Sequence, residues 1–293
     1  MKKLLLIINP VTAKATITPH LIDIIDIFEN GGYDVTTHIS KHKNDMRELI
    51  GSVGESYDVV VSAGGDGTLN ETVSGVLALT KKPKIGYIPS GTTNDFARSW
   101  GIPFNPVTVA KHIVSNEPIK ADICFFCDRP FVYVAAFGAF TEVSYSTPQQ
   151  LKQNLGRTAY LLEGIKSLPT IKPWRMHLEY DGKVIEGDFL YGMLSNTKRV
   201  GGFNLKVKEP ISINDGLMEL ILVRNPDKPV DSAKMLSAVL TQDTKSEYIT
   251  FVQAKNIKFH TDIPMPWTVD GEPGGNLVEG NVKILEHAVE LFI

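Results

Sequence analysis

The chain has 293 residues, of which 43% are hydrophobic, and its formal net charge is −3. This length favours two domains, and the near balance of charge argues against a nucleic-acid partner, which a basic domain would indicate. The two cysteines exclude a disulfide framework, and no apolar stretch is long enough to span a bilayer. The N-terminal run MKKLLLIINP favours a buried strand over a signal peptide, because Asn9-Pro10 interrupts it early. We expect a cytoplasmic protein, with peripheral association at the inner face of the membrane left open.

The first third of the chain alternates between strand and helix patterns. Strand patterns occur at residues 3–9, 33–40, 58–63 and 84–89. Helix patterns occur at residues 18–30, 46–50, 69–79 and 94–100. Strands that alternate with helices indicate right-handed β-α-β crossovers, so this part predicts an α/β domain with a mostly parallel sheet.

The pattern changes near Ala121, and strands dominate from there on. The strand segments are FVYVAAFGAF, WRMHLEY, KVIEGDFLYGMLSN, MELILVRN, ITFVQAKNIKFHT, PWTVDGEP and VKILEHAVELFI. Asp181-Gly182 lies between two alternating runs and predicts a hairpin turn. Helix patterns interrupt the strands at residues 149–167 and 232–240. This part predicts an antiparallel β-sandwich domain.

The segment SAGGDGT, residues 62–68, ends an apolar strand and leads directly into a helix pattern. In an open α/β sheet, ligands bind beyond the carboxyl ends of the strands. Glycines at 64, 65 and 67 let backbone N–H groups approach an anion, and the helix N-terminus adds partial positive charge. Asp66 within this phosphate cradle indicates a bridging Mg²⁺ or a substrate hydroxyl, and Thr68 is placed to cap the helix or to reach a phosphate oxygen.

A second polar turn follows the strand at residues 84–89. Ser90, Gly91, Thr92 and Thr93 form a small loop, after which Asn94-Asp95 opens a helix pattern. Either turn alone is equally well explained as a tight turn or a helix cap. Two such turns in one sheet favour a site that holds a nucleoside triphosphate between them. The chain has neither a P-loop motif nor G-x-G-x-x-G after its first strand, which argues against the P-loop and dinucleotide-binding classes.

Four segments together resemble the diacylglycerol kinase catalytic family. They are Asn9-Pro10, GGDGT at 64–68, PSGTTNDFAR at 89–98 and VDGE at 269–272. The resemblance covers essentially the whole chain, although GGDGT alone would also suit NAD kinases. It implies an α/β ATP-binding domain similar to phosphofructokinases and NAD kinases, residues 1–122 plus 282–293, and a β-sandwich lipid-substrate domain, residues 123–281. The implied reaction transfers the γ-phosphate of Mg-ATP to a lipid hydroxyl, with diacylglycerol as first choice and phosphatidic acid as product.

The resemblance also implies roles for individual residues. Glu272 is the expected general base, and Asp66 and Asp95 are the other expected catalytic acids. The expected nucleotide contacts are Asn9, Gly64, Gly65, Gly67, Thr68, Gly91, Thr92 and Asn94. The expected metal ligands are Asp122, Asp215 and the carbonyl of Leu217. Without the resemblance, Glu272 and Asp215 would pass for turn residues and Asp122 for an exposed charge.

Two further observations bear on the expected site: the repulsion between its acids, and the positions that differ from the family pattern. Asp66, Asp95, Asp122 and Glu272 in one cleft would repel each other without cations, so Mg²⁺ is expected to be integral. Two positions differ from the family pattern. Ala13 stands where glycine is usual, and Thr141 stands where many members carry aspartate.

Two other functions remain open, a kinase of NAD or another small molecule and a non-catalytic nucleotide sensor of the same fold. PSGTTNDFAR and the DGE turn favour a lipid, and the intact acids argue against a sensor. The helix pattern with Lys152, Arg157 and Lys166 fits either the bilayer interface or packing on the sandwich. Cys124 and Cys127 are expected to be buried strand residues. The sequence does not identify the oligomeric state, and a homodimer stays open.

Overall fold

The computed structural model describes residues 1–138, 168–201, 203–207 and 209–293, without the side chains of Thr170 and Phe203. The expected helix at 149–167, with its three basic residues, and Thr141 lie outside the described residues. The chain divides into two compact units, Met1–Ile123 with Glu286–Ile293 and Cys124–Leu285. The sequence interpretation placed these junctions after residues 122 and 281.

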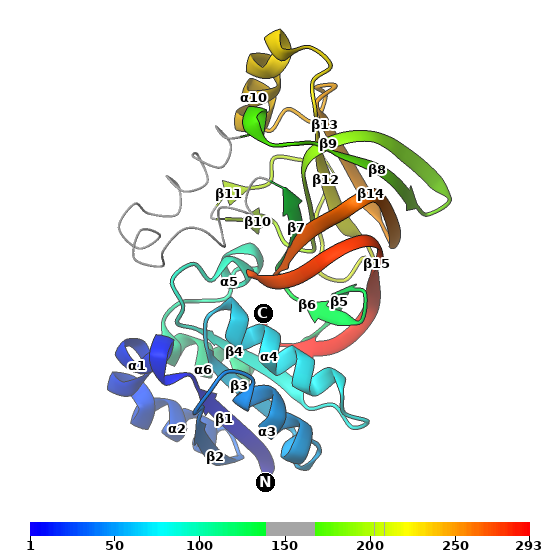
Figure 1. Ribbon diagram of the computed structural model, residues 1–293. Helices are drawn as coiled ribbons and strands as arrows, with labels where there is room; N and C mark the ends of the chain where they lie inside the picture. Colours follow the sequence, from blue (N-terminus) through cyan, green and yellow to red (C-terminus); the bar gives the residue numbers. More distant parts are fainter. Residues whose placement is uncertain (139–167, 202, 208) are drawn as a thin grey trace. The chain divides into compact units, whose positions relative to one another are not determined.

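The first unit contains a parallel sheet with the strand order β4-β3-β1-β2 (Figure 1). Its strands are β1 (Lys2–Ile8), β2 (Tyr33–Ile39), β3 (Val59–Gly64) and β4 (Lys84–Pro89). The end of a later strand extends the sheet, since Leu291 pairs in parallel with Ile85. The parallel strands all end at the same edge of the sheet, so the loops that follow β1, β2, β3 and β4 share that edge.

Six α-helices belong to this unit. They are α1 (Pro10–Ile17), α2 (Leu21–Asn30), α3 (Asp45–Val53), α4 (Asp66–Leu77), α5 (Asp95–Trp100) and α6 (Pro106–Ser115), with short 3₁₀ turns at Thr18–His20 and Gly54–Ser56. The sequence interpretation missed α1 and α6. Both begin with Asn-Pro, where the asparagine side chain accepts a backbone N–H of the first turn and proline occupies the first helical position. Asn-Pro therefore starts a helix at both places.

The second unit is an antiparallel β structure. Its strands are β5 (Ile119–Phe126), β6 (Arg129–Phe131), β7 (Val134–Gly138), β8 (Trp174–Tyr180), β9 (Lys183–Ser195), β10 (Arg199–Val200), β11 (Phe203–Asn204), β12 (Met218–Arg224), β13 (Ile249–Ala254), β14 (Asn256–Val269) and β15 (Glu272–Leu291). Both β7 and β8 pair with β9 and with β14, so these four strands form a closed ring of pairings. The described residues of this unit also contain the helix α10 (Ser232–Thr241) and 3₁₀ turns at Leu168–Thr170 and Pro229–Asp231. The predicted fold class is confirmed.

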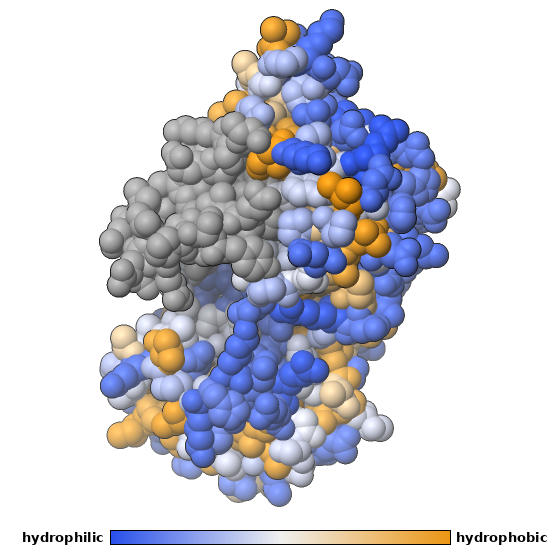
Figure 2. All heavy atoms as spheres, in the orientation of Figure 1, coloured by the Kyte–Doolittle hydropathy of each residue, from blue (hydrophilic) through white to orange (hydrophobic). Residues whose placement is uncertain are grey.

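Aromatic side chains form the centre of the second unit's core. The ring of Trp267 lies 4.7, 5.0 and 4.8 Å, centroid to centroid, from the rings of Phe126, Phe137 and Phe259. These rings are almost fully buried, so the hydrophobic effect and ring–ring contacts stabilise the same residues. On the face of each unit visible in Figure 2, hydrophilic residues predominate and hydrophobic ones form small groups. Within the described ranges, no helix has the length and apolarity needed to cross a membrane.

One expectation about a single residue was wrong. Cys124 is buried in β5 as expected, but Cys127 is only partly buried and lies in the hairpin turn after β5 with φ 52°. Asp122, which the sequence alone would make an exposed charge, is 3% exposed. Its burial follows from a hydrogen bond within the first unit that is described below.

Two glycines of the second unit provide a matched test of packing. Both have positive φ, 93° at Gly138 and 81° at Gly182. A Cβ at Gly138 would lie 2.2 Å from the carbonyl oxygen of Leu190, whereas a Cβ at Gly182 would meet no atom within 4 Å. We expect Gly182→Ala to lower the free energy of unfolding by about 1 kcal/mol. Gly138→Ala should lower it by about 2 kcal/mol more, because the backbone of β9 must move.

The measurement is chemical unfolding of the whole chain, followed by a signal from the tryptophans of the second unit. Equal losses for the two variants would contradict the close contact between Gly138 and Leu190.

Candidate active site

The two glycine turns of the first unit meet backbone to backbone. The N–H of Ser90 donates to the carbonyl oxygen of Gly64 at 2.7 Å. A Cβ on Gly91 would lie 2.5 Å from Cα of Gly65, and one on Gly64 would lie 2.2 Å from Oγ1 of Thr68. A side chain at Gly91 would push the two turns apart, and one at Gly64 would displace Thr68 within its own turn, so packing requires glycine at both positions.

The N-terminus of α4 is open to an anion. Gly65 is its N-cap, and no side chain caps this helix. Gly67, in the first turn, is exposed, and a Cβ placed there would meet no atom within 4 Å. The first N–H groups of a helix have no intrahelical partner and carry partial positive charge. The glycine turn therefore leaves the N-terminus of a twelve-residue helix without a side-chain cap and with free space beside Gly67, which suits an anion.

The carboxylate of Asp66 links the two turns. One oxygen accepts the N–H of Asp95 at 3.1 Å, and the other accepts the N–H of Phe96 at 3.2 Å. Both donors belong to the first turn of α5, so Asp66 acts as the side-chain cap that α5 otherwise lacks. Asp95 itself is buried in that turn. The first glycine turn, through Asp66, thus fixes the position of the start of α5, the helix that follows the second glycine turn.

Asn94 shapes the second turn from within. It has φ 49°, is 3% exposed, and precedes α5 without capping it. Its side-chain oxygen accepts the N–H of Gly91 at 2.9 Å and the hydroxyl of Tyr87 at 3.3 Å, and its side-chain nitrogen donates to the carbonyl of Gly91 at 2.8 Å. Burial raises the pKa of Tyr87, with a contribution from the charge of Asp66, so this hydroxyl stays protonated as a donor. Thr92 is exposed at the tip of the loop.

Asn9 connects the end of β1 to the glycine turn. Its side-chain oxygen accepts the N–H of Val11 at 3.0 Å, and its side-chain nitrogen donates to Oγ1 of Thr68 at 3.1 Å. Ala13, the departure from the family pattern, is buried in α1 and its N–H donates to the carbonyl of Asn9. Alanine is the best helix former, so it suits the helix that stands here.

Three hydroxyls at this edge are buried, and sequence reasoning missed one of them, that of Thr12. Oγ1 of Thr12, Oγ of Ser90 and Oγ1 of Thr93 find no hydrogen-bond partner among the described residues. A buried hydroxyl without a partner costs free energy unless a ligand or water satisfies it. Thr12 follows the end of β1 closely, as the expected site residue Asn9 does. This position after a strand end is the sequence signal that could have identified Thr12.

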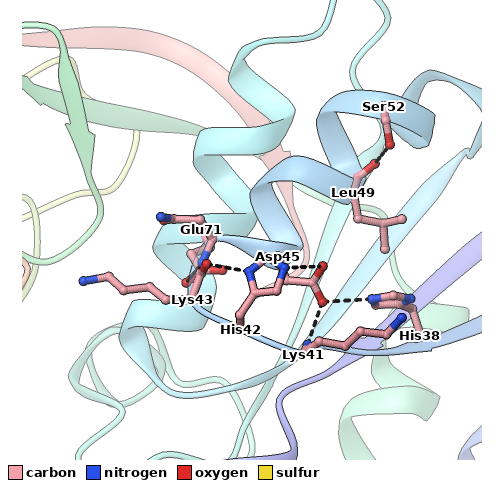
Figure 3. A network of polar contacts seen from close by, with 9 residues as sticks. His38, Lys41, His42, Lys43, Asp45, Leu49, Ser52 and Glu71 are labelled. Atoms are coloured by element: carbon pink, nitrogen blue, oxygen red, sulfur yellow. Dashed lines mark hydrogen bonds and ion pairs between the residues drawn. The ribbon is translucent and has the colours of Figure 1, made fainter.

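The loop after β2 is held rigidly at the same edge of the sheet (Figure 3). The carboxylate of Asp45 accepts the N–H of Lys41 at 2.7 Å and lies 3.1 Å from Nε2 of His38. The hydrogen bond with His38 lowers the pKa of Asp45. Glu71 of α4 accepts the N–H of Asn44 at 3.0 Å. These bonds tie the basic segment 41–43 to α3 and α4.

Asp122 has a structural contact within the first unit. Its Oδ1 accepts the N–H of His287 at 2.6 Å, and His287 has φ 53°. The bond joins β5 to the part of β15 that returns to the first unit. It explains why this carboxylate is buried.

The turn that carries Glu272 is fixed by its neighbour Asp270. The carboxylate of Asp270 accepts the N–H groups of residues 132, 133 and 134 at 2.9, 3.0 and 2.9 Å. Asp270 and Gly271 have φ 50° and 81° and form the tight turn between β14 and β15. Arg129 donates to the carbonyl of Pro273 at 2.8 Å. Glu272, partly exposed, therefore stands on a turn whose backbone is held from both sides.

The remaining expected metal ligands lie just before β12. Asp215 is exposed, and its Oδ1 accepts the N–H of Leu217 at 3.1 Å, which is an Asx turn. Sequence reasoning missed a second acid nearby, Glu219, which is 1% exposed. Burial, together with a smaller contribution from the charge of Asp215, raises the pKa of Glu219 to about 8. Alternation along the strand MELILVR places Glu219 on the buried side, which could have revealed it.

Comparison with known proteins identifies the family. Residues 3–126 match the model of the diacylglycerol kinase catalytic domain, and residues 135–293 match that of the YegS C-terminal NAD kinase β-sandwich-like domain. A diacylglycerol kinase of Bacillus subtilis (strain 168) is 33% identical over 98% of this chain and 95% of its own length. A diacylglycerol kinase of Staphylococcus aureus (strain JH9) is 34% identical over 99% of this chain and 92% of its own.

The fold also matches a crystal structure of a Bacillus anthracis (strain Sterne) protein provisionally described as a diacylglycerol kinase. The TM-score is 0.84 at 23% identity, and the match covers 99% of this chain and 95% of the other. The likeness in fold and the sequence identity to the two curated relatives agree over nearly the full chain. The chain therefore belongs to the diacylglycerol kinase family and is an enzyme, a kinase that phosphorylates an alcohol group.

Proposed function

We propose that the protein transfers the γ-phosphate of Mg-ATP to the free hydroxyl of a lipid, with diacylglycerol as the acceptor and phosphatidic acid as the product. The observation that supports this most directly is the uncapped N-terminus of α4 between two glycine turns. The names of the relatives point to the same acceptor. Because the acceptor is a lipid, the enzyme would work at a membrane surface, from the cytoplasmic side, without a membrane span.

The residues at the edge of the first unit's sheet suit a triphosphate. Gly67 leaves open space above the helix, and the hydroxyls of Thr12 and Ser90 lack partners within the described chain. Backbone N–H groups at a helix N-terminus bind phosphate oxygens well. In the proposal, Gly65 and Gly91 let the two turns approach closely, and Gly64 makes room for Thr68. Asn9 and Asn94 hold the shape of the turns, and Thr68 and Thr92 flank the opening.

Magnesium would neutralise charge between the phosphates, which is the chemistry that such a cation supplies in phosphoryl transfer. Among the described residues, no three His, Cys, Asp or Glu side chains surround a common point. The carboxylates that would hold the cation, through water and phosphate oxygens, are those of Asp66, Asp95 and Asp122. Carboxylates and phosphate oxygens are the ligands Mg²⁺ favours, so these residues suit it. Asp215 and the carbonyl of Leu217 would hold a second, structural cation.

Glu272 is the proposed general base. It would accept the proton of the lipid hydroxyl as the oxygen attacks the γ-phosphorus, and the bond from that phosphorus to the β–γ bridging oxygen breaks. The bonds of Asp270 and Arg129 fix the turn under Glu272, and a fixed base loses little freedom when the substrate arrives. Asp66 accepts two backbone N–H groups, which favours a positioning role for it over that of the base.

The acceptor is tested by phosphate transfer from labelled Mg-ATP to diacylglycerol in mixed micelles, sphingosine, phosphatidylglycerol and NAD. Label in phosphatidic acid alone is the expected result. Label on NAD would favour a small-molecule kinase, and bound ATP with no transfer to any acceptor would favour a nucleotide sensor.

A homodimer is a separate proposal, which sedimentation of the purified chain would test.

Two glycine substitutions separate phosphate binding from packing. Gly67→Ala adds a methyl group where the phosphate is proposed to lie, so KM for ATP should rise about tenfold while the unfolding midpoint stays within error. Gly91→Ala pushes against Gly65, so both ATP affinity and stability should fall. Equal ATP affinity in Gly67→Ala and the parent would contradict the proposed phosphate position.

Two acid substitutions assign the base. Glu272→Gln keeps size and removes the proton acceptor, so kcat should fall by about 10²–10⁴-fold with little change in ATP binding. Asp66→Asn retains an acceptor oxygen for α5, so the fold should persist while the Mg²⁺ concentration for half-maximal rate rises. Unchanged turnover in Glu272→Gln together with an inactive Asp66→Asn would give the role of base to Asp66.

A further inference from the structure

A row of ionisable residues crosses four neighbouring strands of the second unit. Glu186 of β9 pairs in register with His177 of β8, His177 pairs with His260 of β14, and His260 pairs with Glu279 of β15. All four side chains point to the solvent side, since the burial patterns of these strands alternate. None of these residues has a part in the phosphate-transfer site described above.

The two histidines are directly opposite each other on antiparallel strands. Side chains at such positions have Cβ atoms about 4.5–5.5 Å apart. That spacing allows two imidazoles to reach one metal ion, whose bonds to histidine nitrogen are about 2.0–2.1 Å long. His177, His260, Glu179 and Glu279 line one surface hollow of about 420 Å³.

The hydrogen bonding of His177 resembles that of a metal ligand. Its Nδ1 lies 2.7 Å from Oε1 of Glu186, and its Nε2 lies 3.5 Å from Oε1 of Glu179. Metal-binding histidines almost always donate one ring N–H to a carboxylate or carbonyl, which orients the ring and makes the other nitrogen more basic. Glu186 therefore leaves Nε2 of His177 as the ligating atom, with the Glu179 carboxylate close to it. The side chain of His260 has no hydrogen-bond partner within the described chain.

The charge of the hollow favours a cation. Glu179 and Glu279 contribute two carboxylates to its lining, and Glu186 lies opposite His177 in the row. Lys258 is the single lysine or arginine among the residues that line the hollow. An anion such as phosphate would face these carboxylates at short range. Imidazole nitrogens favour zinc, nickel and copper over magnesium or calcium.

We propose that His177 and His260 chelate a zinc-class transition-metal ion, with Glu179 or Glu279 as a third ligand and Glu186 as the residue that orients His177. No three such side chains in the described chain already surround a common point, so the third ligand would reach the ion by rotation of an exposed glutamate. The ion would join β8 to β14, and it is independent of the proposed kinase reaction.

The experiment measures Zn²⁺ affinity of the full chain by competition with a chromogenic chelator at about pH 8, above the ordinary pKa of a histidine side chain. His260→Asn and His177→Gln should each lower the affinity at least about tenfold, and Glu186→Gln should lower it by about 10–100-fold. His20→Gln, an exposed histidine paired with Asp23 and outside the row, is the matched control and should leave it unchanged.

A second readout is the unfolding midpoint, which Zn²⁺ should raise in the parent chain and in His20→Gln but not in His260→Asn. Phosphate transfer without added Zn²⁺ should be the same in His260→Asn as in the parent. No Zn²⁺ binding by the parent would overturn the proposal. So would binding that persists in both histidine variants, which would point to Cys124 and Cys127 as its ligands.

Discussion

The hydrogen bonds from the Asp66 carboxylate to α5 hold the proposed nucleotide site together. They join two turns that lie twenty-nine residues apart in the chain, and they place a negative charge where the first N–H groups of a helix need one. With this link in place, Gly65 and Gly91 approach closely, and Asn94 can close the second turn on itself. The N-terminus of α4 has no side-chain cap, because Asp66 in its first turn accepts N–H groups of α5 instead. The first N–H groups of α4 are therefore available to a ligand.

The same design recurs in the second unit. Asp270 is two residues before Glu272 in the same tight turn, and it too accepts backbone N–H groups from a distant part of the chain. In both units an aspartate beside a glycine orders the backbone near the residues proposed to act in the reaction. A carboxylate suits this task because its two oxygens accept several N–H groups at once.

Much of the fold could be predicted from local pattern. Apolar runs, glycine stops and the Asp181-Gly182 turn follow from neighbours in sequence, and they indicated a parallel sheet followed by antiparallel strands. The position of the glycine turns at strand ends was visible for the same reason. The partners of Asp66, Asp122 and Asp270 were not, because each lies 29 or more residues away and depends on how the strands pair. Glu219 was overlooked because composition gives no signal for a buried acid, and only its position in the strand MELILVR indicates burial.

The return of β15 to the first unit has a consequence for synthesis of the protein. Ile85 of β4 pairs with Leu291, and Asp122 accepts the N–H of His287. The whole of the second unit lies between these partners in the sequence. A ribosome makes the N-terminal residues first, at about 5–20 residues per second. The edge of β4 and a charged carboxylate therefore stay without their native partners until the second unit has emerged. The first unit would be completed only with the last residues of the chain, so a nascent chain could not assemble it ahead of the second unit.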